Sequence, residues 1–280
     1  QFWLIWMVLC MNVSAGIGII GMASPMLQEV FGGKLIGIAK PLADLTLEQK
    51  ASVASIGAAF AGLLSLFNIG GRFFWASLSD FLGRKRTYFI FFALGLLLYV
   101  AAAYAGKAKS TVLFVGLFCV ILTMYGGGFA TIPAYLADLF GTQFVGAIHG
   151  RLLTAWSTAG ILGPVLVNYT REFQIERGVP NEAAYNVTLY LLAGLLFLGF
   201  VSNFLVGPVK KHHFMSEDQL EKEWRVAKQK TITADAATVV ESTKPSAGSW
   251  LGVGVGWTLV GVPLVWGVLK TADKASAFFR

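Results

Sequence analysis

Long stretches without any charged side chain dominate the sequence. Seven runs contain no Asp, Glu, Lys or Arg: 1–28, 51–71, 87–106, 110–137, 152–170, 183–209 and 245–269. Each is long enough to cross a hydrocarbon core of about 30 Å as a helix, which takes roughly 20 residues. None shows the apolar/polar alternation of a membrane β-barrel strand. The pattern therefore predicts an all-α polytopic membrane protein.

The expected helices follow these runs with small extensions. The second run continues past a single charge, Arg72, to about Ser79. We expect helices near 2–25, 53–79, 87–105, 111–137, 147–170, 185–207 and 250–269. The first and fourth share a Gly-rich stretch ending in Pro, at Gly21–Pro25 and Gly128–Pro133. This similarity, three helices apart, favours an internal repeat of the kind found in transporters.

A polar segment of 40 residues, Pro208–Ala247, separates the sixth expected helix from the seventh. Within it, Ser216 and Gln219 fit a capping box. Leu220, Trp224 and Ala227 share one face of the helix that would follow. Two interpretations are open: an amphipathic helix on the membrane surface followed by a flexible tether, or a solvated helix with no partner.

Composition excludes several classes of protein. Only 13% of the 280 residues are charged and 56% are hydrophobic, whereas an ordinary soluble domain is about 25% charged. A soluble enzyme, a disordered protein and a disulfide scaffold are therefore excluded, and Cys10 and Cys119 are expected to be core residues. The net charge of +7 comes from residues that flank the spans, so it does not indicate nucleic acid binding. A modest excess of Lys and Arg places Asp80–Arg86 on the cytoplasmic side.

The connection between the second and third expected helices carries the clearest motif, Asp80-x-x-Gly83-Arg84-Lys85-Arg86. An Asp at one helix end and a basic cluster at the start of the next can form ion pairs that break when the helices move. Gly83 would permit the tight turn between them. The motif is therefore a candidate conformational switch. The alternative is a solvated turn anchored by lipid headgroups.

This segment resembles the inter-helix signature of the major facilitator superfamily, with Ala76 and Phe81 in place of the usual Gly and Arg. Together with Gly126–Ala134 and Thr154–Pro164, it is similar to the oxalate/formate antiporter family within that superfamily. The order of the motifs resembles the C-terminal six-helix half of a twelve-helix transporter.

We expect three parts in this chain, of which the resemblance covers only the first. Residues 1–209 would form a six-helix half-bundle and residues 210–248 a cytoplasmic amphipathic helix with a flexible tether. Residues 249–280 would add one C-terminal transmembrane helix and a short tail. An N-terminal six-helix half, on the same chain or as a separate subunit, is the implied partner. We expect a multi-pass protein of the bacterial inner (plasma) membrane.

Arg72 is the main candidate for binding a substrate. It stands about 12 Å along the helix from Asp80, and a charge at such depth costs at least ~2.5–3.5 kcal/mol. No other charged residue lies deep in an expected span, so a small organic anion is the natural counter-ion. A guanidinium holds a carboxylate through two parallel hydrogen bonds. The alternative is an arginine bonded to backbone carbonyls or to the other half.

Four further residues are candidates for the same site. Asn68 lies one helical turn from Arg72 and could add a hydrogen bond. Tyr125 and Phe129 are four residues apart and could form the wall of a cavity, although packing alone would explain them. The resemblance implies that the arginine binds the carboxylate. It also puts Trp156 where the family's oxalate transporter has a lysine.

The sequence thus predicts a secondary active, antiporter-like transporter of small carboxylates, such as formate, oxalate or other monocarboxylates, working by alternating access. A site with one cation favours a monocarboxylate. No cofactor, metal site or catalytic cluster is expected, so the protein is not expected to be an enzyme. Its other partner is the lipid bilayer. The alternative is a non-transporting membrane subunit or sensor built on a carrier half.

Overall fold

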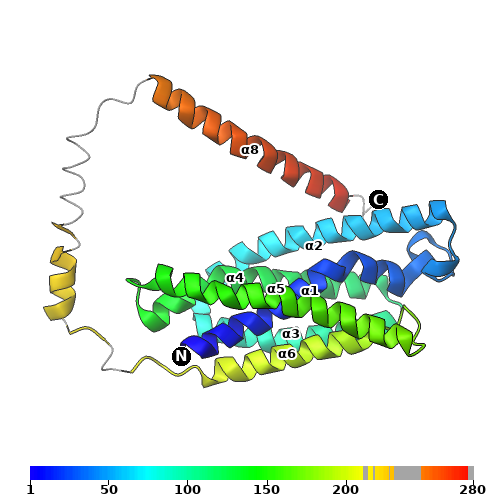
Figure 1. Ribbon diagram of the computed structural model, residues 1–280, viewed down its shortest axis with the longest axis horizontal. Coiled ribbons are helices and arrows are strands. Elements are labelled where there is room, and N and C mark those ends of the chain that lie inside the picture. The colour runs from blue at the N-terminus through cyan, green and yellow to red at the C-terminus, as the bar shows by residue number, and fades with distance from the viewer. Residues whose placement is uncertain (211–213, 217, 227, 230–246, 277–280) are drawn as a thin grey trace. The chain divides into compact units, whose positions relative to one another are not determined.

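The computed structural model describes residues 1–210, 214–216, 218–226, 228–229 and 247–276. All of its regular structure within these residues is helical (Figure 1). The long helices are α1 (Phe2–Phe31), α2 (Leu47–Leu82), α3 (Arg84–Lys107), α4 (Thr111–Phe140), α5 (Val145–Glu176), α6 (Tyr185–Leu205) and α8 (Ala247–Ser276). Two short 3₁₀ turns, Gly32–Ile36 and Leu42–Asp44, connect α1 to α2.

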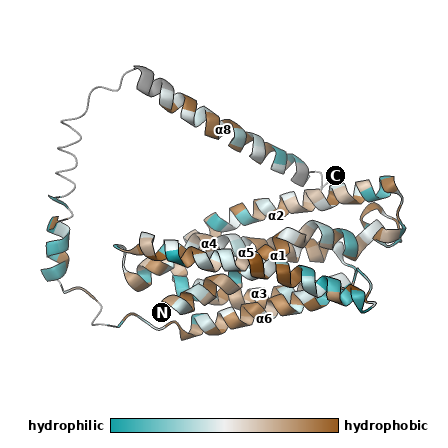
Figure 2. Ribbon diagram, viewed as in Figure 1, coloured by the Kyte–Doolittle hydropathy of each residue, from teal (hydrophilic) through white to brown (hydrophobic). Residues whose placement is uncertain are grey.

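Each of the seven expected helices is present, and within the described ranges six helices are long and apolar enough to cross a membrane. The expected fold, an all-helical multi-pass membrane protein, is confirmed. Helix α5 is not among these six, although it is 32 residues long and packs extensively against α1. Its exposed face carries Thr154, Ser157, Thr158 and Asn168, which lower its hydropathy. In Figure 2 the bundle helices are mainly brown, and teal residues concentrate toward the connections.

Helices α1 to α6 pack as a bundle whose contacts repeat between its two halves. The most extensive pairings are α2 with α4 and α1 with α5, followed by α3 with α6. Suppose that α1, α2 and α3 are repeated as α4, α5 and α6. The repeat then turns the α2–α4 pairing into the α5–α1 pairing, and it turns the α3–α6 pairing into itself. This arrangement supports the internal repeat that the glycine and proline patterns suggest.

Glycines create the closest contacts at the same places in both halves. A Cβ on Gly71 of α2 would lie 2.2 Å from the Thr123 carbonyl oxygen of α4. In the equivalent pair, a Cβ on Gly163 of α5 would lie 2.4 Å from the Ser14 carbonyl oxygen of α1. Both distances are too short for any side chain. The two interfaces therefore depend on glycine, as expected where membrane helices approach closely.

Replacing Gly71 by Ala should destabilise the bundle. The added methyl group would collide with the α4 backbone and force the helices apart, at a cost of about 1–3 kcal/mol. The matched control is Gly70→Ala, because a Cβ at Gly70 has no heavy atom within 4 Å. We expect a clearly lower unfolding temperature in detergent for the first variant and no loss for the second. Equal unfolding temperatures would contradict the close packing.

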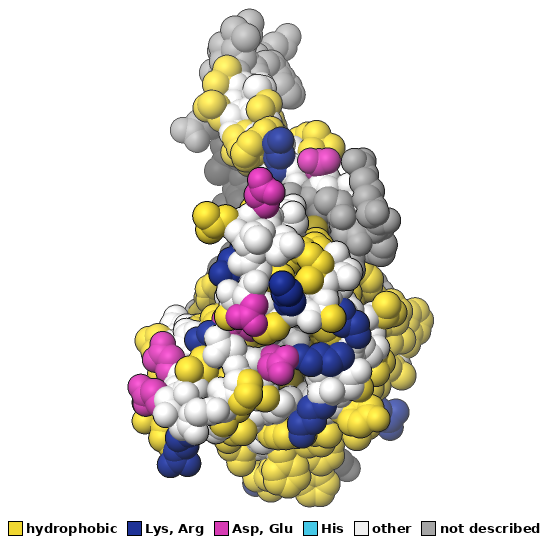
Figure 3. Space-filling model, turned by 90° about the vertical axis from the view of Figure 1, so that its right-hand side faces the viewer, with side chains coloured by type: hydrophobic (Ala, Val, Ile, Leu, Met, Phe, Trp, Pro, Cys, Tyr) yellow, Lys and Arg dark blue, Asp and Glu magenta, His cyan; other side chains and the backbone are white. Residues whose placement is uncertain are grey.

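Ion pairs hold the end of the bundle near the α1–α2 connection, which we call the Glu29 end. Arg171 of α5 donates to both carboxylate oxygens of Glu29 in α1, at 3.0 and 2.7 Å. The two side chains are only 20% and 15% exposed. Lys109 pairs with Glu182 and donates to the Val30 carbonyl at 2.8 Å. Figure 3 views this end, where Lys and Arg side chains lie near Asp and Glu side chains.

These contacts correct the expected helix ends. The first helix continues past 25 to Phe31, and the fifth continues past 170 to Glu176. The sequence runs ended where the charges begin. Pairing Glu29 with Arg171 compensates their burial, so both helices continue through the charged residues.

The segment after the bundle is described by itself. Residues 218–226 form a short helix, and the expected capping box is confirmed. The Ser216 amide donates to Gln219 Oε1 at 3.1 Å, and the Gln219 amide donates to Ser216 Oγ at 3.4 Å. Leu220 and Trp224 are exposed, whereas Ala227 and the expected tether at 230–246 lie outside the described residues. Helix α8 qualifies as a candidate span over Gly252–Asp273.

Candidate substrate site

Arg72 lies on an exposed face of α2. Among the residues that the structure describes, no carboxylate lies within ion-pair distance of its guanidinium. The guanidinium carbon lies 5.4 Å from the ring centroid of Phe129 in α4. Such a contact stabilises a cation without neutralising it. The charge is therefore available to an anion.

The aromatic residues form a cluster that continues from α4 to α5. The rings of Phe129 and Trp156 are 5.9 Å apart between centroids and tilted by 52°. Tyr125 lies one turn before Phe129 on α4, and its side chain lies near those of Trp156 and Arg72. Trp156 is 43% exposed. Three helices thus bring together four of the predicted residues, and we call them the Arg72 cluster.

Asn68 occupies a different environment. Its side-chain oxygen is buried and faces Gly126 of α4, and it has no hydrogen-bond partner in the part of the chain that the structure describes. A Cβ on Gly126 would lie 2.6 Å from that oxygen. Asn68 therefore packs in the α2–α4 interface, one helical turn before Arg72 in α2.

The predicted switch motif forms the turn between α2 and α3. Arg84 pairs with Asp80, and its Nε lies 4.0 Å from a carboxylate oxygen of Asp138 at the end of α4. Gly83 has φ 86°, a conformation that favours glycine. Three basic residues at a helix N-terminus are unfavourable with respect to the helix dipole, and the two carboxylates offset them.

Lys85 ties this turn to α6. Its ammonium donates to the carbonyls of Phe204, at 3.3 Å, and Val206, where a cation is favourable near a helix C-terminus. The Lys85 carbonyl accepts from Asn203 at 3.1 Å, and Asn203 accepts from the Tyr135 hydroxyl at 3.0 Å. Arg86 is exposed. The motif therefore contacts α4 and α6 as well as its own two helices.

Two polar features escaped the sequence analysis. One is the Glu29–Arg171 pair, which would have required a prediction of which charges at the span ends meet. The other is Asn12, a 5% exposed amide of α1 whose side-chain nitrogen has no hydrogen-bond partner among the described residues. A single Asn in an apolar helix does not indicate from the sequence alone whether it is buried or which groups surround it. Among the described residues, no three His, Cys, Asp or Glu side chains gather as metal ligands.

Comparison with known proteins agrees with this architecture. Residues 7–272 match the family described as Major Facilitator Superfamily. Over 224 residues the chain is 28% identical to a protein of Oxalobacter formigenes named "Oxalate:formate antiporter". The match covers 78% of this chain and 46% of that protein, so the chain spans about half the length of this relative.

The superfamily match covers nearly the whole bundle and includes every member of the Arg72 cluster. Its members are transporters rather than enzymes, in agreement with the sequence analysis. This multi-pass integral membrane protein belongs to the Major Facilitator Superfamily.

Proposed function

We propose that the chain forms half of a secondary transporter that exchanges small carboxylates by alternating access. The observation that carries this proposal is the Arg72 guanidinium, which lies exposed among aromatic side chains with no carboxylate partner in the described residues. A fixed cation of this kind needs a mobile counter-ion, because an unpaired charge at membrane depth is costly. A small carboxylate can act as this counter-ion while it is bound, and it leaves the site when it is transported.

The Arg72 cluster suits an anion with one carboxylate. The guanidinium fork matches a single carboxylate through two hydrogen bonds. Phe129 and Trp156 offer apolar surface to a short organic group. The relative from Oxalobacter formigenes is named for both oxalate and formate. With Trp156 where the resemblance places a lysine, a second carboxylate would have no cation, so we infer a preference for formate, lactate or a similar monocarboxylate over oxalate.

The other half of the transport path must come from further protein. The chain spans about half the length of its relative, and α2 exposes large apolar side chains next to Arg72, including Phe73 at 74% and Phe74 at 60%. A second six-helix half, on the same chain or as a separate subunit, would cover this face. The polar face of α5 would then line the path between the halves.

We infer that the Asp80–Arg84 pair acts in the conformational change. It joins the end of α2 to the start of α3, and Arg84 also faces Asp138 of α4. Movement between these helices would separate the two charges and expose them to water. Breaking the ion pair would cost little free energy, because Asp80 is already 63% exposed. The motif can therefore reform without a large barrier.

The part after residue 209 leaves a second function open. We infer that residues 210–248 lie on the cytoplasmic side and that 249–280 add a transmembrane helix, which is consistent with the candidate span Gly252–Asp273. Such an addition would also suit a non-transporting subunit or sensor. Binding of a monocarboxylate without any flux in proteoliposomes would favour that alternative.

Counterflow of labelled formate, lactate and oxalate in proteoliposomes of the complete transporter tests the proposed function. The unmodified protein should exchange formate or lactate in preference to oxalate. Trp156→Lys should shift the preference toward oxalate by about tenfold or more, because a second cation compensates the second carboxylate. Tight oxalate exchange by the unmodified protein would contradict the inferred preference. It would mean that the other half supplies the second cation.

A further inference from the structure

Helices α1, α2 and α3 all contact one short glycine run of α4, Gly126–Gly128. A Cβ on the first glycine would lie 2.2 Å from the backbone carbonyl oxygen of Asn68 in α2, and a Cβ on the last would lie 2.2 Å from the side-chain nitrogen of Asn12 in α1. From α3, the Tyr88 hydroxyl donates to the Gly128 carbonyl at 2.5 Å. The run therefore meets these helices with its backbone.

The run lies in a part of α4 that has little internal support. Glycine stabilises a helix less than residues with a side chain, because it loses more conformational freedom on folding. Pro133 lies inside α4 and has no N–H, so the Phe129 carbonyl lacks its usual donor one turn later. Glycine and proline are among the residues at which helices bend. Phe129 of the Arg72 cluster thus stands between two places where α4 can bend.

The hydroxyl of Tyr88 holds the backbone at this point. The Gly128 carbonyl belongs to the planar peptide group that also contains the Phe129 nitrogen. Fixing that oxygen therefore limits the rotation of the backbone that carries the Phe129 ring. Tyr88 is fully buried, and its ring centroid lies 5.3 Å from that of Phe91 and 5.6 Å from that of Tyr135. These neighbours keep the hydroxyl in place.

The Tyr88 bond differs from the other support that the run receives. The Thr131 hydroxyl donates to the carbonyls of Gly127 and Gly128 at 2.9 and 3.3 Å, but it belongs to α4 and moves with it. Within the described part of the chain, Tyr88 is the one side chain of another helix that hydrogen-bonds to these carbonyls. It thereby fixes α4 relative to α3 beside Phe129.

We propose that Tyr88 is a positioning residue for the anion site: through the Gly128 carbonyl it holds the Phe129 ring against the Arg72 guanidinium, 5.4 Å from the ring centroid. This inference rests on the proposed function, because it takes Phe129 and Arg72 as parts of that site. Tyr88 is fully buried and does not touch the anion. Without its hydroxyl the peptide group before Phe129 can rotate, and the guanidinium loses its fixed ring contact.

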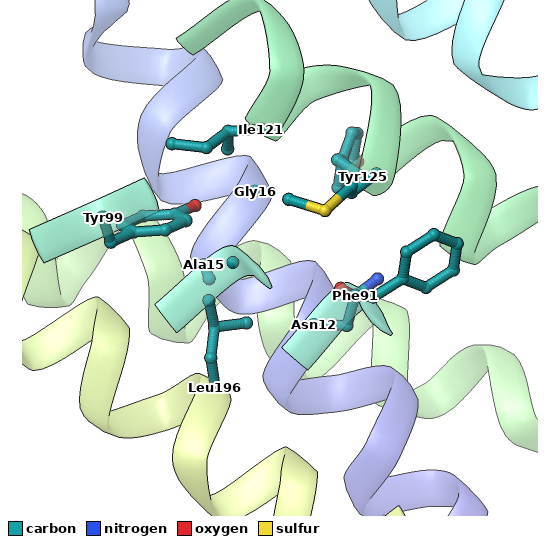
Figure 4. A pocket seen from close by; sticks show the side chains of 10 residues that line it. Asn12, Ala15, Gly16, Phe91, Tyr99, Ile121, Tyr125 and Leu196 are labelled. Carbon is teal, nitrogen blue, oxygen red and sulfur yellow. The ribbon is translucent and has the colours of Figure 1, made fainter. Parts of the chain in front are cut away.

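Tyr88→Phe in the complete transporter tests this role, because the substitution removes only the hydroxyl. The KM for formate in counterflow should rise about threefold to tenfold, while the maximal exchange rate changes by less than about twofold. The matched control is Tyr99→Phe in the same helix. Tyr99 is also buried, but in Figure 4 its hydroxyl points into a small cavity between α1, α3, α4 and α6. The control should keep the KM.

A double variant separates positioning from a general loss of stability. If Tyr88 acts through Phe129, Tyr88→Phe should change the KM by less than about twofold once Phe129→Ala is present. Effects of the two substitutions that simply multiply would overturn the proposal. An unchanged KM in Tyr88→Phe alone would overturn it as well.

A signal that does not depend on transport distinguishes this proposal from the proposed function. With para-fluorophenylalanine in place of Phe129, the fluorine resonance should shift or broaden in Tyr88→Phe and stay unchanged in Tyr99→Phe. An identical resonance in both variants and in the unmodified protein would overturn the positioning role. If Arg72→Ala keeps full activity, the proposed function fails, while the resonance still decides whether Tyr88 positions the ring.

Discussion

Replacing Arg72 by Ala should abolish carboxylate exchange, with a loss of at least about a hundredfold. The substitution removes the one cation of the cluster, and the bound carboxylate would stay buried without a counter-charge, which costs several kcal/mol. Arg72→Lys should retain part of the activity, because an ammonium keeps the charge but loses the two-pronged geometry. Counterflow of labelled formate in proteoliposomes measures both effects.

The chain provides a matched control for this experiment. Arg177 also lies over an aromatic ring, 4.1 Å from the centroid of Phe173, but it stands beyond the end of α5 and is exposed. Arg177→Ala removes the same type of side chain and the same type of ring contact. It should leave exchange within about twofold of the unmodified protein. Full activity in Arg72→Ala would refute the assignment of the anion site.

Breaking the Glu29–Arg171 pair should produce the largest loss of stability. Glu29→Ala leaves Arg171 mostly buried without its carboxylate, and removing one partner of a buried pair is strongly destabilising. Because the two side chains retain 15% and 20% exposure, we expect about 2–3 kcal/mol rather than more. The unfolding temperature in detergent measures the effect.

Two comparisons separate the pair from general damage at the Glu29 end. The double variant Glu29→Ala with Arg171→Ala should lose less stability than the sum of the single variants, because no charge is left unpaired. Glu182→Ala breaks the neighbouring pair with Lys109, whose side chains are 46% and 40% exposed. It should cost at most about 1 kcal/mol. Strictly additive losses would show that Glu29 and Arg171 do not stabilise each other.

The hydropathy pattern could predict which segments are helical but not how far each extends. Runs free of charge locate the spans, because a bilayer admits few isolated charges. They cannot show that Glu29 and Arg171 pair across α1 and α5, since that pairing depends on the contact between two helices. The run 152–170 likewise predicts a helix at α5, whereas the extensive contact of α5 with α1 follows only from the fold.

Periodicity alone could predict only part of the candidate site. Arg72 is conspicuous because it is a lone charge within an apolar helix. That Trp156 of α5 meets Phe129 of α4 follows from the fold, and the sequence suggested it only through the family resemblance. The contacts of Gly71 and Gly163 follow from helix crossing points, which residue spacing does not reveal.

A structure of the complete transporter with a bound monocarboxylate tests the central claim most directly. We predict that the carboxylate lies against the Arg72 guanidinium at about 2.7–3.0 Å from its nitrogens, with its organic group between Phe129 and Trp156. An anion bound elsewhere, with Arg72 paired to a carboxylate side chain of the other half, would contradict the account.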